Sequence, residues 1–222
     1  KSIFYGGKCM LILDVPYQEK DEAKRLGARW NTEIKKWYVE GKGDYYQFAK
    51  WILPYGNAVI CDALYILEGK QKCDKCDKIT RVVAFGVERH TYLLGNEKKE
   101  YKRLIKRYQK QINIVERIEP MPKPILKYLQ RKYSCKILFE NRYSNCCDNC
   151  RFLLDEVDYL FQFQSDENNP FIIDSIEKVK NLKIYKISLA RDIIVDLGAV
   201  YYEPETWMLK KYGDIIPLDI EC

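Results

Sequence analysis

The chain has 222 residues, 47 % of them apolar, and carries a formal net charge of +6 at pH 7. That length suffices for one large domain or two to three small ones, and the apolar fraction suffices for a packed core. No stretch approaches the roughly 20 apolar residues of a membrane-spanning helix, so we expect no membrane segment.

Residues 8–53 predict a small α+β module of the form strand–helix–hairpin–helix. Its elements are expected as a strand at 11–15, a helix at 19–26, hairpin strands at 28–30 and 36–39, and a second helix at 44–53. Pro16 ends the first strand because proline cannot donate to a ladder. Gly27 is a suitable left-handed cap for the first helix.

The predicted hairpin combines aromatic and basic residues. Trp30 and Trp37 lie on its strands, and Lys35 and Lys36 lie in and just after the turn. Basic groups beside aromatic faces can bind single-stranded nucleic acid by phosphate contact and base stacking. A module this small also needs large side chains to fill its core, so we interpret both tryptophans as core residues. Lys35 and Lys36 remain available to contact a partner.

Residues 13–31 read LDVPYQEKDEAKRLGARWN, and residues 35–39 read KKWYV. Together they resemble a small bacterial domain of unknown function with the pattern VP(F/Y)xEK(D/E)xAKxLGA(R/K)W(D/N)…KxWY, over residues 11–52. That domain is found beside plasmid-type primase modules, and some members continue with a split pair of Cys-x-x-Cys motifs. The resemblance implies a DNA-processing or mobile-element neighbourhood and no particular reaction.

Two Cys-x-x-Cys pairs follow, separated by 70 residues: Cys73 with Cys76, and Cys147 with Cys150. Each short turn can present two sulfurs to one ion, so the four thiolates can close a tetrahedral zinc site. Four protein ligands leave no open position for water, which indicates a structural Zn²⁺. The alternatives are four unrelated buried thiols or a redox dithiol.

Two further residues are candidate ligands. Cys146 abuts Cys147 and could replace it, and His90, the only histidine, could replace one cysteine. Cysteine pairs directed at a metal suit a reducing compartment better than a disulfide framework does, so we expect a cytoplasmic protein.

The segment between the pairs is the most basic part of the chain. Residues 77–146 carry 17 basic and 7 acidic side chains, a net charge of +10, whereas residues 147–222 carry 8 and 15, a net charge of −7. Such asymmetry is typical of a polyanionic partner for the basic part, and a solvated surface or packing against the acidic part explains it equally well.

A strand at 80–88, a helix at 97–113, a helix at 125–133 and a strand at 136–140 are expected within this segment. The helix at 97–113 belongs to a basic insertion at about 90–133. Its exposed face supplies further candidates for phosphate binding, which are Lys99, Lys102, Arg103, Lys106, Arg107 and Lys110.

The remaining chain is divided into a split zinc domain at 54–165 and a C-terminal module at 170–222. Asp192 and the Leu-Gly-Ala run at 197–199 echo Asp21 and the run at 26–28. We interpret residues 182–216 as a degenerate repeat of the first module. Coincidence within a common helix–glycine–strand pattern is the alternative.

The sequence therefore predicts an α+β protein of small modules with a zinc-stapled segment, a basic helical insertion and no catalytic centre. It lacks the glycine-rich loops of nucleotide sites, so no small-molecule cofactor is expected. The favoured function is an accessory protein that binds nucleic acid through the phosphate backbone. The alternative is a protein–protein scaffold, such as an inhibitor or adaptor, with a protein partner on the same basic surface. Catalysis on nucleic acid by Asp155 and Asp158 is a third hypothesis.

Overall fold

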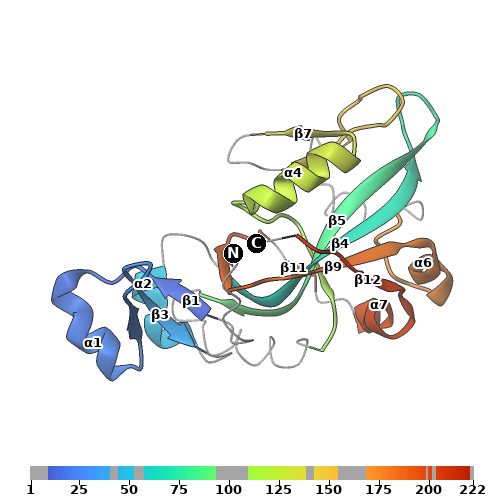
Figure 1. Cartoon of the computed structure of the whole chain (residues 1–222). Helices are drawn as coiled ribbons and strands as arrows, with labels where there is room; N and C mark the ends of the chain where they lie inside the picture. The colour runs from blue at the N-terminus through green and yellow to red at the C-terminus, as the bar shows by residue number, and fades with distance from the viewer. Residues whose placement is uncertain are drawn as a thin grey trace.

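The structure is a computed structural model that describes residues 10–40, 45–52, 58–93, 110–138, 143–154, 169–198, 200–201 and 204–220. These ranges contain both helices and strands, and nearly all of the strand pairs are antiparallel, which confirms the α+β class (Figure 1). Within them, no helix has the length and apolar character needed to cross a membrane.

The N-terminal module is a three-stranded antiparallel sheet with short helices. Its strands, in the order β1-β3-β2, are β1 (Met10–Leu13), β2 (Arg29–Asn31) and β3 (Lys36–Glu40). Its helices are the 3-10 turns η1 (Tyr17–Glu19) and η2 (Tyr45–Phe48) and the α-helices α1 (Lys20–Arg25) and α2 (Ala49–Ile52). The predicted order of elements is confirmed. Gly27 follows α1 at φ 100°, the left-handed conformation expected of a glycine cap.

A long β-hairpin forms the centre of the rest of the chain. Its strands, β4 (Ala58–Lys72) and β5 (Ile79–Tyr92), are adjacent in a seven-stranded sheet. The path is β11-β6-β5-β4-β9-β12, and β10 also pairs with β4. The other strands are β6 (Asn113–Val115), β9 (Lys183–Ser188), β10 (Ile193–Val195), β11 (Val200–Tyr201) and β12 (Ile215–Pro217). The strand expected at 80–88 lies within β5.

Both faces of this sheet are covered, which explains why β4 is apolar along most of its length. Successive residues of β4 point to opposite faces, so Leu64 and Ile66 join one core cluster, and Tyr65 and Leu67 join the other. Helix α4 (Lys123–Lys132) packs on the first face, and α6 (Ile176–Asn181) and α7 (Trp207–Tyr212) pack on the second (Figure 1). Helix α4 confirms the helix expected at 125–133.

The C-terminal segment completes the central sheet, so the predicted boundary between residues 165 and 170 is wrong. Strand β9 pairs with β4 from Ala63 to Glu68, and β12 pairs with β9 in parallel. The physical reason is that β4 is a central strand, and its second edge needs hydrogen-bond partners that the β5 side cannot supply. These partners come from more than 100 residues later in the chain.

The predicted repeat at 182–216 is also wrong. The residues that would match α1 contain strand β10, which pairs with Ala58–Ile60 of β4. Gly198 is left-handed, with φ 60°, as Gly27 is. The shared Leu-Gly pair therefore reflects one common requirement of the backbone, a residue that tolerates positive φ, in two unrelated surroundings.

Residues 97–109 of the predicted basic helix lie outside the described residues. The end of that helix was placed too late, because Asn113 begins β6 and hydrogen-bonds within the sheet. The strand expected at 136–140 corresponds to β7 (Cys135–Ile137), which pairs with β8 (Tyr143–Asn145) in a small separate sheet. Asp155 and Asp158, the candidates for nuclease chemistry, lie outside the described residues.

The N-terminal module and the central sheet share a core. Leu11, Ala23 and Ile52 of the module cluster with Val59 of β4 and with Leu93 after β5. The loop between β9 and β10 adds polar contacts. The backbone N–H of Asp192 donates to the carbonyl of Met10 at 3.2 Å, and the Tyr45 hydroxyl donates to the buried Asp192 carboxylate.

Candidate metal centre

The four predicted cysteines lie together at one end of the central hairpin. Cys73 and Cys76 occupy the turn between β4 and β5, and Cys147 and Cys150 occupy the turn after β8. All four sulfurs lie within 4.8 Å of one another. The Sγ–Sγ distance is 3.8 Å between Cys73 and Cys150 and 3.7 Å between Cys76 and Cys147. Four converging sulfurs are compatible with a metal site.

The two Cys-x-x-Cys turns have the same backbone design. In the first, the N–H of Asp77 donates to the Cys73 carbonyl at 2.8 Å, and the N–H of Cys73 donates to the Lys78 carbonyl at 2.9 Å. The second repeats both bonds at 3.0 and 2.8 Å, between Arg151 and Cys147 and between Cys147 and Phe152. Asp77 and Arg151, each four residues after the first cysteine, have φ of 59° and 61°. Both turns are therefore closed by the same two local backbone hydrogen bonds.

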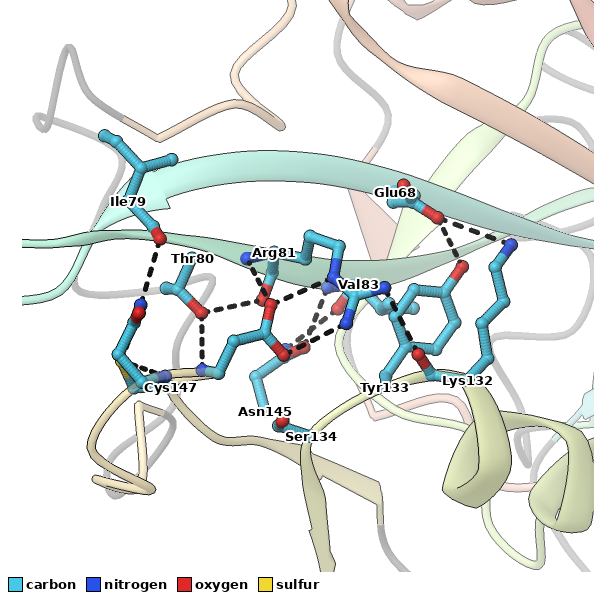
Figure 2. Close-up of polar contacts among 12 residues, drawn as sticks. Glu68, Ile79, Thr80, Arg81, Val83, Lys132, Tyr133, Ser134, Asn145 and Cys147 are labelled. Carbon is cyan, nitrogen blue, oxygen red and sulfur yellow. Dashed lines mark hydrogen bonds and ion pairs between the residues drawn. The ribbon is translucent and has the colours of Figure 1, made fainter.

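The second turn docks on an edge of β5 that β6 does not reach, since β6 pairs with β5 only at residues 85–87. The side-chain amide of Asn145 takes the place of a strand there (Figure 2). Its Oδ1 accepts from the N–H of Val83 at 2.8 Å, and its Nδ2 donates to the Val83 carbonyl at 2.9 Å. One buried side chain thereby satisfies both backbone groups of an otherwise unpaired strand residue.

Asp148, between the second pair of cysteines, binds the same edge two residues earlier. Its carboxylate accepts from the Arg81 backbone N–H at 3.2 Å and from Arg81 Nε at 2.9 Å. Its own N–H donates to Thr80 Oγ1 at 2.8 Å (Figure 2). Burial raises the pKa of the Asp148 carboxyl, but the hydrogen bonds from Arg81 outweigh burial and hold that pKa at about 2. Asp148 is therefore ionised at neutral pH.

The C-terminal end of α4 belongs to the same polar network. Arg81 Nη1 donates to the Lys132 carbonyl at 3.3 Å, and Tyr133 donates its hydroxyl to the buried Glu68 of β4 at 2.7 Å (Figure 2). Lys132 Nζ lies 3.4 Å from the Glu68 carboxylate. Burial raises the pKa of Glu68, but the Tyr133 hydroxyl and the Lys132 charge lower it below its usual range.

Cys147, and not Cys146, belongs to the sulfur cluster. Cys146 is buried outside that cluster, and its N–H donates to the Ser134 carbonyl at 2.9 Å. Burial raises the pKa of the Cys147 thiol, but hydrogen bonds from the backbone of Cys150 and Asn149 lower it to about 6. These hydrogen bonds favour the Cys147 thiolate, which is the form that binds metal.

His90 does not take part in the cluster. It lies toward the other end of the central hairpin, where it pairs with Ile60, and its side chain is buried. Burial lowers the pKa of its imidazole to about 4, so His90 is neutral at pH 7.

The candidate phosphate-binding residues are only partly placed. Lys35 and Lys36 are exposed on the β2–β3 hairpin, and Lys110 is exposed in a turn before β6. Lys36 forms an ion pair with Asp14 at 3.4 Å. The other candidates, Lys99, Lys102, Arg103, Lys106 and Arg107, lie outside the described residues.

The interpretation of Trp30 as a core residue is wrong. Its side chain is 49 % exposed, whereas Trp37 is half-buried and packs against the module's core. The reason is that β2 is a three-residue edge strand, so the row of side chains that contains Trp37 ends at Trp30. The alternation of residues in the hairpin predicts the face of each tryptophan but not which strand lies at the edge.

Sequence reasoning missed the residues that hold the second turn on β5, namely Thr80, Arg81, Asn145 and Asp148. The only local signal was the pair of polar residues inside the Cys-Asp-Asn-Cys motif. Nothing in the spacing indicates that their partners lie on β5.

Two curated proteins share a short stretch with this chain. Both are named "DNA primase TraC" and come from Escherichia coli, and they are 56 % and 54 % identical to it over 48 residues. These matches cover 22 % of this chain but only 3 % and 4 % of the relatives, so the likeness is confined to a small part of each. No solved structure is significantly similar to the chain.

The N-terminal module coincides with a known family. Its described elements run from β1 to α2, at residues 10–52. Residues 10–53 match the family model described as a domain of unknown function, DUF5710, which confirms the expected resemblance to such a domain. The chain thus carries a DUF5710 domain at its N-terminal end, followed by a larger sheet with a cluster of four cysteines.

Proposed function

We propose that this chain is a non-enzymatic accessory protein that is stabilised by zinc and binds nucleic acid, mainly through the phosphate backbone. The observation that carries the proposal is the pair of exposed cations, Lys35 and Lys36, on a rigid hairpin of the DUF5710 domain. The primase names of the two relatives support DNA as the polyanion, and a mobile-element setting.

The proposed ion is Zn²⁺, because four thiolates in two Cys-x-x-Cys turns form its usual structural site. A tetrahedral ion with Zn–S bonds of about 2.3 Å has neighbouring sulfurs about 3.8 Å apart. The Sγ–Sγ distances of 3.8 Å between Cys73 and Cys150 and 3.7 Å between Cys76 and Cys147 agree with that spacing. Cys73, Cys76, Cys147 and Cys150 would fill all four positions, so the ion would hold the two turns together and leave no position for a reacting water.

The hairpin turn that carries the two lysines is held by Asn31. Its Oδ1 accepts from the N–H of Glu33 at 2.9 Å and from the N–H of Ile34 at 3.1 Å. The ion pair of Lys36 with Asp14 is exposed on both sides and is worth at most about 1 kcal/mol, so a phosphate can replace the carboxylate. Lys110 and the five cations at 99–107 are further candidates for phosphate contacts.

A binding assay at two salt concentrations tests the proposal. With about six phosphate contacts, affinity for duplex DNA falls roughly a thousandfold between 50 and 200 mM salt. Labelled single- and double-stranded DNA and RNA are titrated by fluorescence polarisation. Lys35→Gln with Lys36→Gln lowers affinity, whereas Lys24→Gln with Lys123→Gln, which removes equal charge from α1 and α4, does not. Absence of binding at low salt contradicts the proposal.

A protein partner on the same basic surface is the second candidate, as for an adaptor or inhibitor. Exposed Ile34, next to Lys35 in the hairpin turn, favours it, because apolar side chains contribute more to protein interfaces than to phosphate contacts. Purification from nuclease-treated cells separates the candidates. A stoichiometric protein that stays bound after the nucleic acid is removed supports this one.

We also propose a cytoplasmic location. Metal binding requires four reduced thiols, and a reducing compartment keeps them in that state.

A further inference from the structure

Trp30 is the outermost side chain of a row that crosses the small sheet. In the antiparallel register, Leu13 lies opposite Trp37, and Trp37 lies opposite Trp30. The two indoles meet edge to face, with centroids 5.7 Å apart and planes at 65°. Trp37 packs on the core, so this contact holds Trp30 in place while 49 % of its side chain stays exposed.

Other exposed aromatic rings of the described chain already have a cation over them. Tyr17 is 75 % exposed, and Lys20 Nζ lies 4.0 Å from its ring centroid. Trp207 is 42 % exposed, and Lys211 Nζ lies 5.2 Å from its centroid. Among the residues that the structure describes, the ring contact of Trp30 is the one with Trp37. Its exposed surface is therefore open to a planar ligand.

Of the described cations on this hairpin, Lys35 is the one without an assigned face or ion pair. Arg29 and Lys36 are offset by one residue from Trp30 and Trp37, so their side chains point to the opposite face of the sheet, where Arg29 pairs with Glu40 at 3.2 Å and Lys36 pairs with Asp14. Lys35 has a left-handed backbone, with φ 52°, and within the described ranges it forms no ion pair. An uncommitted ammonium on a fixed turn is suited to a phosphate that lies next to a stacked base.

We propose that Trp30 is a stacking platform for an unpaired base, and that Lys35 holds a flanking phosphate, so that this site selects single strands over duplex. The inference rests on the proposed nucleic-acid binding and specifies its substrate class. In a duplex both faces of each internal base are covered by neighbours, and the indole cannot replace them without unstacking the helix. A single strand exposes these faces at little cost, whatever the base.

Competition between two DNA probes tests the inference on the full chain with its metal bound. One probe is a single strand of about 12 nucleotides, which is within the usual site sizes, and the other is the same sequence as a duplex. Trp30→Leu retains apolar packing on Trp37 but has no aromatic face. Trp30→Phe retains a face. Trp207→Leu is the matched control, since it makes the same change at the other half-exposed tryptophan.

The wild-type protein binds the single strand more tightly than the duplex. Trp30→Leu lowers single-strand affinity about 5- to 100-fold with an unchanged salt slope, and leaves duplex affinity unaltered. Trp30→Phe and Trp207→Leu stay near the wild type. Lys35→Gln reduces the salt slope by about 0.7. If Trp30→Leu does not fold, a fluorescence measurement replaces this comparison. The single strand then quenches tryptophan fluorescence in the wild type, and this quenching is lost in Trp30→Phe.

Equal affinity for both probes overturns the inference, as does a Trp30→Leu effect that is absent or the same for strand and duplex. In each case salt-dependent binding that persists leaves the proposed function standing. Failure of the wild type to bind either probe at low salt overturns both proposals.

Discussion

The side chains of Asn145 and Asp148 make hydrogen bonds to the edge of β5 that a neighbouring strand would otherwise make. Asp148 accepts from the backbone N–H of Arg81, and Asn145 binds the backbone N–H and carbonyl of Val83. Arg81 and Val83 both lie on the part of β5 that has no pairing with β6. Edge N–H groups left unpaired and buried cost about 1–3 kcal/mol each. The same two side chains flank the first ligand of the second turn, so the pairing of β5 and the position of Cys147 depend on each other.

Substitution of Asp148 tests this dependence. Asp148→Ala leaves the Arg81 N–H and guanidinium without their acceptor and lowers the free energy of unfolding by about 1–3 kcal/mol. Asp148→Asn retains an acceptor oxygen and loses less. Urea unfolding measures stability, and competition with a chelator measures metal affinity, which falls in the same order. Equal stability of Asp148→Ala and the wild type would show that this network is incidental.

His90 makes a prediction about pH. Its folded-state pKa is lowered to about 4 by burial, against an ordinary value of about 6.5. The unfolded chain therefore binds an additional proton between these values, so stability is full above pH 6.5 and falls as pH drops toward 4. The expected loss is about 3 kcal/mol. His90→Gln flattens this part of the profile relative to the wild type. Acid also releases metal from both proteins, so the difference between their two stability profiles reports the contribution of His90 alone.

At the scale of elements, local patterns were sufficient for the N-terminal module and insufficient for the central sheet. Gly27, Pro16 and the alternation around Trp37 are signals contained within a few residues, and they predicted the module's order of elements. The pairing of β4 with β9 joins segments more than 100 residues apart and has no local signal. The same limit applies to the site, where the cysteine spacing is local and the docking of Asp148 on Arg81 is not.

Replacement of single cysteines tests the metal staple. Cys73→Ser, Cys76→Ser, Cys147→Ser and Cys150→Ser each reduce bound zinc from about one equivalent per chain and lower the melting temperature. Cys146→Ser is the matched control, because it alters the adjacent sulfur outside the cluster and retains the metal. Metal content by mass spectrometry and thermal melts give both readings. Full zinc content in Cys147→Ser would contradict the assignment of that ligand.

At the scale of the whole molecule, the DUF5710 domain is attached to the sheet by a shared apolar core and by Asp192. This buried carboxylate accepts from the Tyr45 hydroxyl, and its backbone N–H binds the Met10 carbonyl. The domain and the sheet are therefore expected to unfold together, although the family model covers only residues 10–53.

Removal of the Tyr45 hydroxyl tests the coupling. Tyr45→Phe removes the hydroxyl that donates to the buried Asp192 carboxylate, and so lowers the free energy of unfolding by about 1–3 kcal/mol. Limited proteolysis then cleaves between the domain and the sheet faster than in the wild type. Tyr38→Phe, on a half-buried strand position of the same domain, is the control. Unchanged proteolysis in Tyr45→Phe would show that the apolar core alone joins the two parts.

The two sulfur turns are far apart in sequence, and the most positively charged 70 residues of the chain lie between them. An ion bound by both turns would close that stretch into a ring, and this closure would be reversible because the ion can dissociate. The stability of the fold would then depend on the free zinc concentration. Each tenfold rise in free zinc above its dissociation constant adds about 1.4 kcal/mol to the free energy of unfolding. Starvation for the ion would open the ring, and the two turns would then be held only by the hydrogen bonds and packing of the strands beside them.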